Sequence, residues 1–203
     1  MGDKDLNTEQ KILEAAKIVF VRKGMEGARM QEIADEAEIN KALLHYYFRT
    51  KDKLFEAVFK DAFYKMVPNI VDLMKSETPL FTKIELFAEN YIDIFIENPF
   101  VPGFVLHELN RNPQRMVNLI SNIGIDPEIF IQQINEEVQK GNIEPVNPYH
   151  LIVNMLSMCI FPFAATPIIK NIIFENNSES FNEFLISRKK EVPQFIINSI
   201  KKK

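Results

Sequence analysis

Apolar residues recur every three or four positions along most of the chain, and the two-residue alternation typical of strands is nearly absent. The first such stretch predicts a helix that begins at Asn7 or Thr8, both good N-caps, and ends at Gly24. Glycine stops helices because it adopts left-handed backbone conformations at little cost. The apolar face of this helix consists of Ile12, Leu13, Ala16, Val19 and Phe20.

Two short helices joined by a tight turn are expected next. The first lies around residues 30–37, Glu38-Ile39-Asn40 forms the turn, and Asn40 caps a second helix over residues 41–48. Thr50 then caps a longer helix that runs up to or through Pro68. Two short helices with so short a connection have the geometry of a helix-turn-helix unit.

The rest of the chain is divided into further helices by prolines and glycines. The stretch from Leu151 to Ile169 is uncharged and long enough to span a membrane. Polar residues and two prolines interrupt it, so we expect a helix buried in the core or at a subunit interface. Ser178 or Ser180 is expected to cap the last helix. We predict an all-α fold of about nine helices, the later ones covering about 79–97, 102–111, 127–141, 148–172 and 178–203.

The composition excludes several classes of function. The net charge of −4 disfavours non-specific coating of nucleic acids but leaves room for a local DNA-reading surface. A lone cysteine, Cys159, excludes an internal disulfide and a thiolate metal cage. The three histidines lack the spacing of a metal site, and the six glycines form no phosphate-binding loop. These absences predict a protein that is not an enzyme and uses neither a metal nor a cofactor. Since no signal peptide is visible, we expect a cytoplasmic location.

The second short helix carries side chains that suit the reading of DNA bases. Leu44 and Phe48, four residues apart, face the core together. On the other side, Lys41 can donate to guanine and Ala42 can touch a thymine methyl group, next to His45. The residue types and their spacing therefore favour a recognition helix.

Phosphate contacts are expected beside these base contacts. Tyr46, Tyr47 and Lys51 can each donate a hydrogen bond to a phosphate oxygen. The alternative is that the aromatic run over 46–48 only packs in the core, as aromatic residues at helical spacing usually do.

Several spaced segments point the same way. KIVFVRKG closes the first helix, IADEA lies in the second, INKALLHYYF covers the recognition helix, and TKDKLF opens the fourth. Together, over residues 8–63, they resemble the DNA-binding domain of TetR-family transcriptional regulators. The resemblance implies a helix-turn-helix domain over residues 1–52 and a ligand-binding and dimerisation domain over residues 53–203. The DNA-contacting positions that it implies are Lys41, Ala42 and His45 for bases, Leu43, Tyr46, Tyr47 and Lys51 for phosphates, and Arg29 and Gln31 near the backbone.

Three positions depart from the family pattern. Ala28-Arg29 replaces the Thr or Ser that usually caps the second helix, a loss on the order of 1 kcal/mol, although Arg29 could supply a phosphate contact instead. Glu38 replaces a frequent turn glycine, and a left-handed conformation there costs roughly 1–2 kcal/mol. Leu43 stands where a small hydroxyl residue is common, so a thymine methyl group is an alternative partner to a phosphate.

The C-terminal part is expected to form a homodimer. A single helix-turn-helix unit buries little DNA surface, and a symmetric pair gains both affinity and a spacing requirement. By analogy with the family, the last two helices, about 148–172 and 178–201, form a four-helix bundle with a second copy. Their expected apolar contributors are Leu151, Met155, Met158, Phe184, Ile196, Ile197 and Ile200.

A candidate ligand pocket is expected in the same part of the chain. Aromatic walls with few polar groups suit a hydrophobic effector. The alternative for each phenylalanine is plain core packing, and His107 has the alternative of a satisfied buried histidine. The candidate pocket residues are Phe87, Tyr91, Phe104, His107, Glu108, Phe130, Phe161 and Phe163.

The sequence therefore predicts a repressor that a hydrophobic small molecule releases from a palindromic operator in double-stranded DNA. In this interpretation the effector moves the helix over residues 51–74, so that the two 41–48 helices no longer match successive major grooves. The main alternative is a helical carrier of small molecules or lipids that does not read DNA. A protein-interaction adaptor without an internal cavity is a third possibility.

Overall fold

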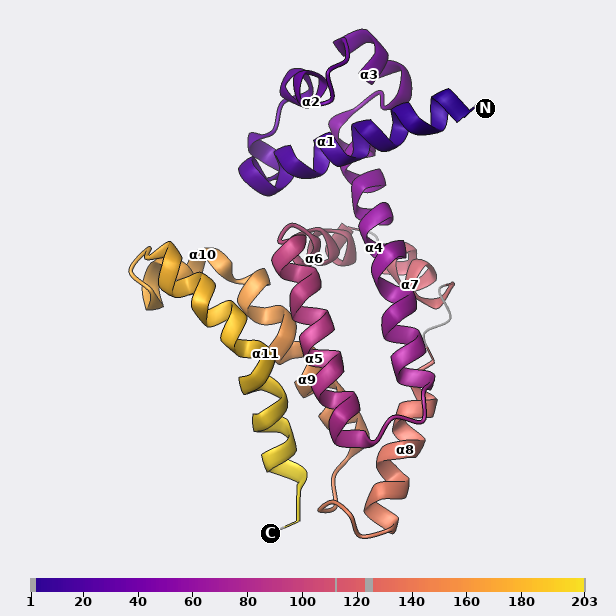
Figure 1. Ribbon diagram of the computed structural model, residues 1–203, viewed down its shortest axis with the longest axis vertical. Coiled ribbons are helices and arrows are strands. Elements are labelled where there is room, and N and C mark those ends of the chain that lie inside the picture. The colour runs from indigo at the N-terminus through magenta and orange to yellow at the C-terminus, as the bar shows by residue number, and fades with distance from the viewer. Residues whose placement is uncertain (1–2, 112, 123–125, 203) are drawn as a thin grey trace. The chain divides into compact units, whose positions relative to one another are not determined.

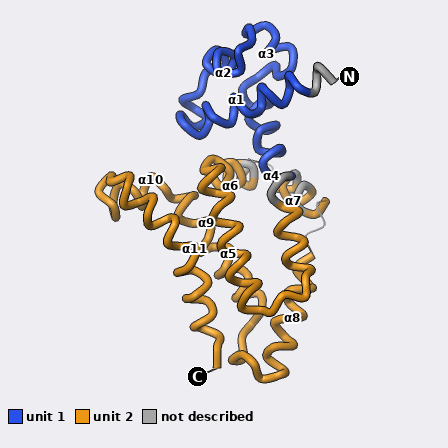
Figure 2. The backbone as a smooth tube through the Cα atoms, viewed as in Figure 1, with its two compact units in different colours: residues 1–66 blue, residues 67–203 orange. Residues whose placement is uncertain are grey.

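The computed structural model describes residues 3–111, 113–122 and 126–202. In these ranges the fold is all-α, as predicted, with eleven α-helices and one π-helical turn (Figure 1). The chain forms two compact units, residues 1–66 and 67–203 (Figure 2). Their division falls inside the fourth helix, whereas the domain limit expected from the sequence lies at its start.

The first unit is a small helical domain whose helices follow the predicted pattern, except that α1 begins at Asp3 and the expected caps Asn7 and Thr8 lie inside it. Gly24 has a φ of 67°, so the left-handed stop lies where the sequence predicts it, and one more turn follows before the next helix. Phe20 packs edge-to-face against Phe55, with ring centroids 4.8 Å apart. The helices are α1 (Asp3–Gly27), α2 (Met30–Glu36), α3 (Lys41–Tyr47) and the first turns of α4 (Lys51–Lys75).

Side-chain caps fix the ends of α3 and α4. The Asn40 side-chain oxygen accepts a hydrogen bond from the Leu43 N–H at 2.7 Å, and Thr50 Oγ1 accepts one from the Lys53 N–H at 3.2 Å. Both caps confirm the prediction. Glu38, in the turn between α2 and α3, has a φ of 53°, so the left-handed conformation is adopted by a residue with a Cβ.

The second unit contains the remaining helices. Among these, α7 is not predicted by the sequence analysis: it begins at Pro113, and a proline can end one helix or occupy the first turn of the next. The cap of the last helix is Asn177, whose side-chain oxygen accepts from the Ser180 N–H, so the expectation of Ser178 or Ser180 is wrong. The helices are α5 (Leu80–Glu97), α6 (Val101–Arg111), α7 (Pro113–Ser121), α8 (Glu128–Gln139), α9 (Pro148–Ala164), α10 (Thr166–Ile168), the π-helical turn η1 (Ile169–Ile173) and α11 (Ser178–Ile200).

The helix predicted over 148–172 is broken rather than continuous. Pro167 has no N–H to offer the Phe163 carbonyl, and the Thr166 hydroxyl donates to that carbonyl at 2.9 Å instead. No single helix in the described ranges is long and apolar enough to cross a membrane. Among the described residues, one bent pair, α9 with Thr166–Ile173, meets this requirement by length and composition alone; its two parts meet at 63°.

A buried lysine closes the corner between α4 and α5. Lys83 is 1% exposed, and its ammonium donates to the carbonyls of Met74 and Ser76 at 3.0 and 2.8 Å. Burial lowers the pKa of this ammonium. A positive charge at the C-terminal end of α4 is favourable for the helix dipole, so Lys83 satisfies both hydrogen bonding and electrostatics at this corner.

Candidate nucleic-acid interface

Helix α3 presents one polar face and one buried face. Leu44 is 0% exposed and Phe48 is buried, so the two expected core anchors are where the 3.6-residue period places them. The three residues that the sequence assigns to base reading, Lys41, Ala42 and His45, are all exposed. Two anchors on one side thus hold the other side of a short helix free for a ligand.

The two tyrosines of α3 differ in exposure. Tyr46 is 79% exposed and Tyr47 is half-buried, which rules out plain core packing for Tyr46. Their rings meet edge-to-face with centroids 5.4 Å apart. Leu43 is also half-buried, so it lies at the border of the exposed face.

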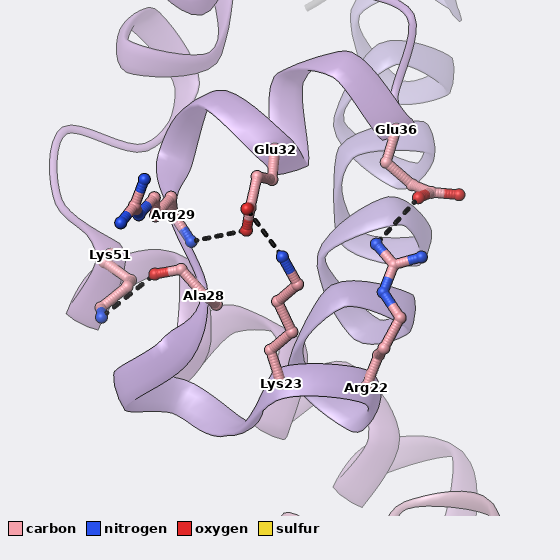
Figure 3. A network of polar contacts seen from close by, with 7 residues as sticks. All are labelled: Arg22, Lys23, Ala28, Arg29, Glu32, Glu36 and Lys51. Atoms are coloured by element: carbon pink, nitrogen blue, oxygen red, sulfur yellow. Dashed lines mark hydrogen bonds and ion pairs between the residues drawn. The ribbon is translucent and has the colours of Figure 1, made fainter.

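The N-terminal end of α2 is stabilised by a carboxylate, and the side chain of the N-cap residue Arg29 makes no capping hydrogen bond. Glu32 accepts hydrogen bonds from the Lys23 ammonium at 2.7 Å and from the Arg29 backbone N–H at 3.4 Å (Figure 3). The Lys23 hydrogen bond is the main cause of a lowered pKa at Glu32. Arg29 thereby keeps its side chain for another partner, and Figure 3 shows the guanidinium pointing away from Glu32.

Two of the residues expected to contact the DNA backbone have hydrogen-bond partners within the protein. The Lys51 ammonium donates to the Ala28 carbonyl at 3.3 Å (Figure 3) and to the Glu26 carbonyl at 3.2 Å. The Gln31 side-chain amide donates to Asp35 at 2.8 Å. An ammonium has three donors, so Lys51 can reach a phosphate while it holds the end of α1. Sequence reasoning missed this bracing role, as it missed Glu32, although Glu three residues after a helix start is a known capping signal.

The residues expected to form a ligand pocket divide into three groups. Phe87 and Tyr91 stack at 4.9 Å between ring centroids, and Phe95, 4.8 Å from Tyr91, joins them to Phe163 at 5.3 Å. Burial raises the pKa of the Tyr91 hydroxyl above its usual value, and the neighbouring Cys159 adds to the effect. Phe104 and Phe130 are buried elsewhere in the second unit.

The other expected pocket residues lie outside this aromatic row. His107 is exposed and therefore not the buried histidine of the alternative interpretation, and the side chain of Glu108 lies outside the described residues. Phe161 is exposed and lines an open groove of about 410 Å³. The groove lies between α9, η1 and α11, and its lining is Ser157, Met158, Phe161, Pro162, Ile169, Ile173, Phe174, Phe184 and Arg188.

The described residues contain no group of three His, Cys, Asp or Glu side chains that could hold a metal ion. Cys159 is fully buried, and burial raises the pKa of its thiol to about 12. A thiol that keeps its proton is a poor nucleophile and metal ligand.

The fold and the exposed face of α3 define a helix-turn-helix DNA-binding protein with a larger helical second unit. Residues 12–58 match the family model described as bacterial regulatory proteins, tetR family. Residues 12–58 are thus similar to the DNA-binding domain of the TetR family of transcriptional regulators, as the sequence resemblance predicts. The relatives and the fold of the chain are those of regulators and not of enzymes.

Individual relatives extend this similarity beyond the first unit. Probable HTH-type transcriptional regulator YttP of Bacillus subtilis (strain 168) is 24% identical over 180 residues, which cover 87% of this chain and 86% of that protein. The transcriptional repressor NicS of Pseudomonas putida (strain KT2440) is 40% identical over 53 residues, 26% of this chain and 25% of that protein. A TetR/AcrR-family regulator from Thermobifida fusca shares the fold with a TM-score of 0.66 at 15% identity, covering 92% of this chain and 97% of that one.

Proposed function

We propose that this protein is a homodimeric repressor that binds a palindromic operator through α3 and is released by a hydrophobic small molecule. The observation that carries the proposal is the two-sided α3, with Leu44 buried and Lys41, Ala42 and His45 exposed. A hydrogen-bonding face held on a fixed short helix is what reading of base edges in the major groove requires.

The proposed dimer is supported by the distribution of exposed apolar side chains. Among the residues whose side chains the structure describes, nine large apolar side chains are 56% exposed or more. One of these is Tyr46 on α3, and all the others belong to α9, α10, η1 and α11. These eight are Tyr149, Val153, Phe161, Ile168, Ile172, Ile173, Ile186 and Phe195.

The residues that the sequence selected for this interface are mostly internal. Leu151, Met155, Ile196 and Ile200 are each 4% exposed or less, so they form the core of the second unit and are unavailable to a partner. An uninterrupted apolar helix does not reveal from sequence which of its sides faces inward. Large exposed apolar side chains on consecutive elements are typical of a protein–protein contact surface, so we propose that these eight side chains, and not the buried ones, contact the partner.

The proposed effector site is the aromatic row of Phe87, Tyr91, Phe95 and Phe163. It combines three buried phenylalanine rings with a single hydroxyl whose pKa burial raises. Such a site takes a hydrophobic compound with at most one hydrogen-bonding group directed at Tyr91. Effector and operator then weaken each other's binding by the same factor.

The test begins with gel shifts on the protein's own upstream region and on duplexes selected from random sequence. We expect a sequence-specific shift at moderate salt for the wild type, weaker binding for Tyr47→Ala, and no change for Lys190→Ala in the second unit. No specific shift for the wild type on either DNA would contradict the proposal and favour the carrier interpretation.

The effector part is tested with a panel of hydrophobic compounds. Compounds that raise the Tm of the wild type should also weaken its operator binding, and Tyr91→Ala should reduce both effects together. Compounds that stabilise the protein without any change in operator affinity would contradict effector-controlled release.

A further inference from the structure

One face of α11 carries a chemically symmetric row of four residues. Phe184, Arg188, Glu191 and Phe195 are spaced by four, three and four positions, which places them on one side of an α-helix. This spacing is that of the contact seam in a coiled coil. Along the seam the order is aromatic, cation, anion, aromatic, so the row is matched by its own antiparallel copy.

Arg188 has incomplete contacts within its own chain. One terminal nitrogen of its guanidinium donates to the Met158 carbonyl at 2.6 Å, and the group lies over the Phe184 ring at 5.4 Å from the centroid. The Nε atom is buried without a hydrogen-bond partner. Burial also lowers the pKa of Arg188. A carboxylate is the partner that a partly desolvated guanidinium binds best.

The other members of the row are open to a partner. Glu191 is exposed and Phe195 is 63% exposed, although both lie beside the buried residues Val192 and Ile196. At the Phe184 end, the groove of about 410 Å³ between α9, η1 and α11 is lined mainly by apolar side chains. An exposed phenylalanine at one end of the row and an apolar groove at the other are complementary in chemistry.

We infer that α11 pairs antiparallel with α11 of a second copy, about a two-fold axis that passes between positions 189 and 190. This inference rests on the proposed homodimer and adds its register. The axis places Arg188 opposite Glu191 of the partner subunit, and Phe184 with its groove opposite the partner's Phe195. Two-fold symmetry repeats each contact, so the interface has two ion pairs flanked by two aromatic contacts. In an antiparallel coiled coil, each a position of one helix faces a d position of the other, and Arg188 faces the partner's Glu191 in this way.

Charge reversal tests the register in the full-length protein. We expect Glu191→Arg to raise the dimer dissociation constant at least tenfold, because symmetry creates two like-charge contacts. The exchanged variant Arg188→Glu/Glu191→Arg restores opposite charges and should return to within about threefold of the wild type. Lys190→Glu, an exposed charge reversal off this face, is the matched control and should change little. Sedimentation velocity measures the constants, and circular dichroism verifies the fold of each variant.

Cross-linking gives a readout that does not depend on Arg188, whose loss could disturb the fold. In a Cys159→Ala background, Phe184→Cys/Phe195→Cys should form a covalent dimer on mild oxidation, and neither single variant should do so. Unchanged dimerisation of Glu191→Arg, or equal cross-linking of a single variant, would overturn the register while leaving the proposed dimer in place. A wild type that sediments as a monomer would overturn the proposed dimer and the register together.

Discussion

Helix α3 and the α9–α11 region both expose large apolar side chains, but the chemistry of the two surfaces differs. On α3 the exposed ring is Tyr46, with Lys41 and His45 on the same helix, so every large exposed side chain ends in a hydrogen-bonding group. From α9 to α11 the exposed side chains include Phe161, Ile172 and Phe195, which have none.

The difference indicates two kinds of partner. A surface of polar-tipped side chains loses little by staying in water and gains directional contacts with a polar partner such as a DNA groove. A surface of isoleucine and phenylalanine is costly in water and gains by contact with another apolar surface. In the proposed function, one chain thus separates DNA recognition from self-association by the type of side chain that each region exposes.

The largest expected effect comes from removing the support of α3. Leu44→Ala should lower the free energy of unfolding of the first unit by about 2–5 kcal/mol, because it leaves a cavity beneath the helix. Operator binding should be lost while the proposed dimer of the second unit persists. Urea denaturation and sedimentation measure the two effects, and the exposed Tyr46→Ala serves as the control for stability. Equal losses from both variants would contradict the two-sided description of α3.

The exposed side of α3 should separate base reading from phosphate contact. Lys41→Ala should cost about 1–3 kcal/mol of binding to the selected operator and relax the preference at one base pair in each half-site. Tyr46→Phe should weaken binding less and equally for all sequences, because only a phosphate contact is lost. Binding assays on single-base-pair operator variants provide the measurement. A uniform loss for Lys41→Ala would assign Lys41 to the phosphates instead.

Burial of the Cys159 thiol in α9 should make the free energy of unfolding depend on pH. The pKa of Cys159 is about 12 in the folded chain, against 9.0 as the ordinary value. Above pH 9 the unfolded chain therefore releases a proton that the folded chain keeps, and stability falls by up to about 1.4 kcal/mol per pH unit. The difference in unfolding free energy between the wild type and Cys159→Ala isolates this group. A difference that stays constant from pH 8 to 10.5 would mean that the thiol is accessible.

The smallest expected effect is a gain in stability at the turn before α3. Glu38 adopts a φ of 53°, so Glu38→Gly should stabilise the first unit by about 1 kcal/mol. Glu38→Ala removes the exposed contact with Lys11 but keeps the strained conformation, so it should gain nothing. Thermal denaturation compares the three proteins. A gain for Glu38→Ala as large as that for Glu38→Gly would attribute the effect to charge rather than to backbone strain.

The sequence was most informative where local chemistry decides the structure. Gly24 as a helix stop, Asn40 as a cap, and the burial of Leu44 and Phe48 follow from backbone preferences and helical periodicity, and the structure confirms them. The same reasoning located α3 as the candidate recognition helix before any three-dimensional information.

The sequence was least informative where distant segments meet. The burial of Lys83 depends on carbonyls at the end of α4, which no pattern around position 83 reveals. The inner and outer sides of α9 and α11 could not be told apart, because both sides are apolar. Leu151 and Ile196 were therefore assigned to the interface, although they form the core.

In the proposed function, two α3 helices read one duplex from successive major grooves. Hydroxyl-radical footprinting of the wild type on its selected operator tests this most directly. We expect two protected half-sites on one face of the duplex, about 10 base pairs apart from centre to centre, and a higher protein concentration for protection of both in Lys41→Ala. A single protected half-site, or uniform protection along the duplex, would contradict paired reading by two α3 helices.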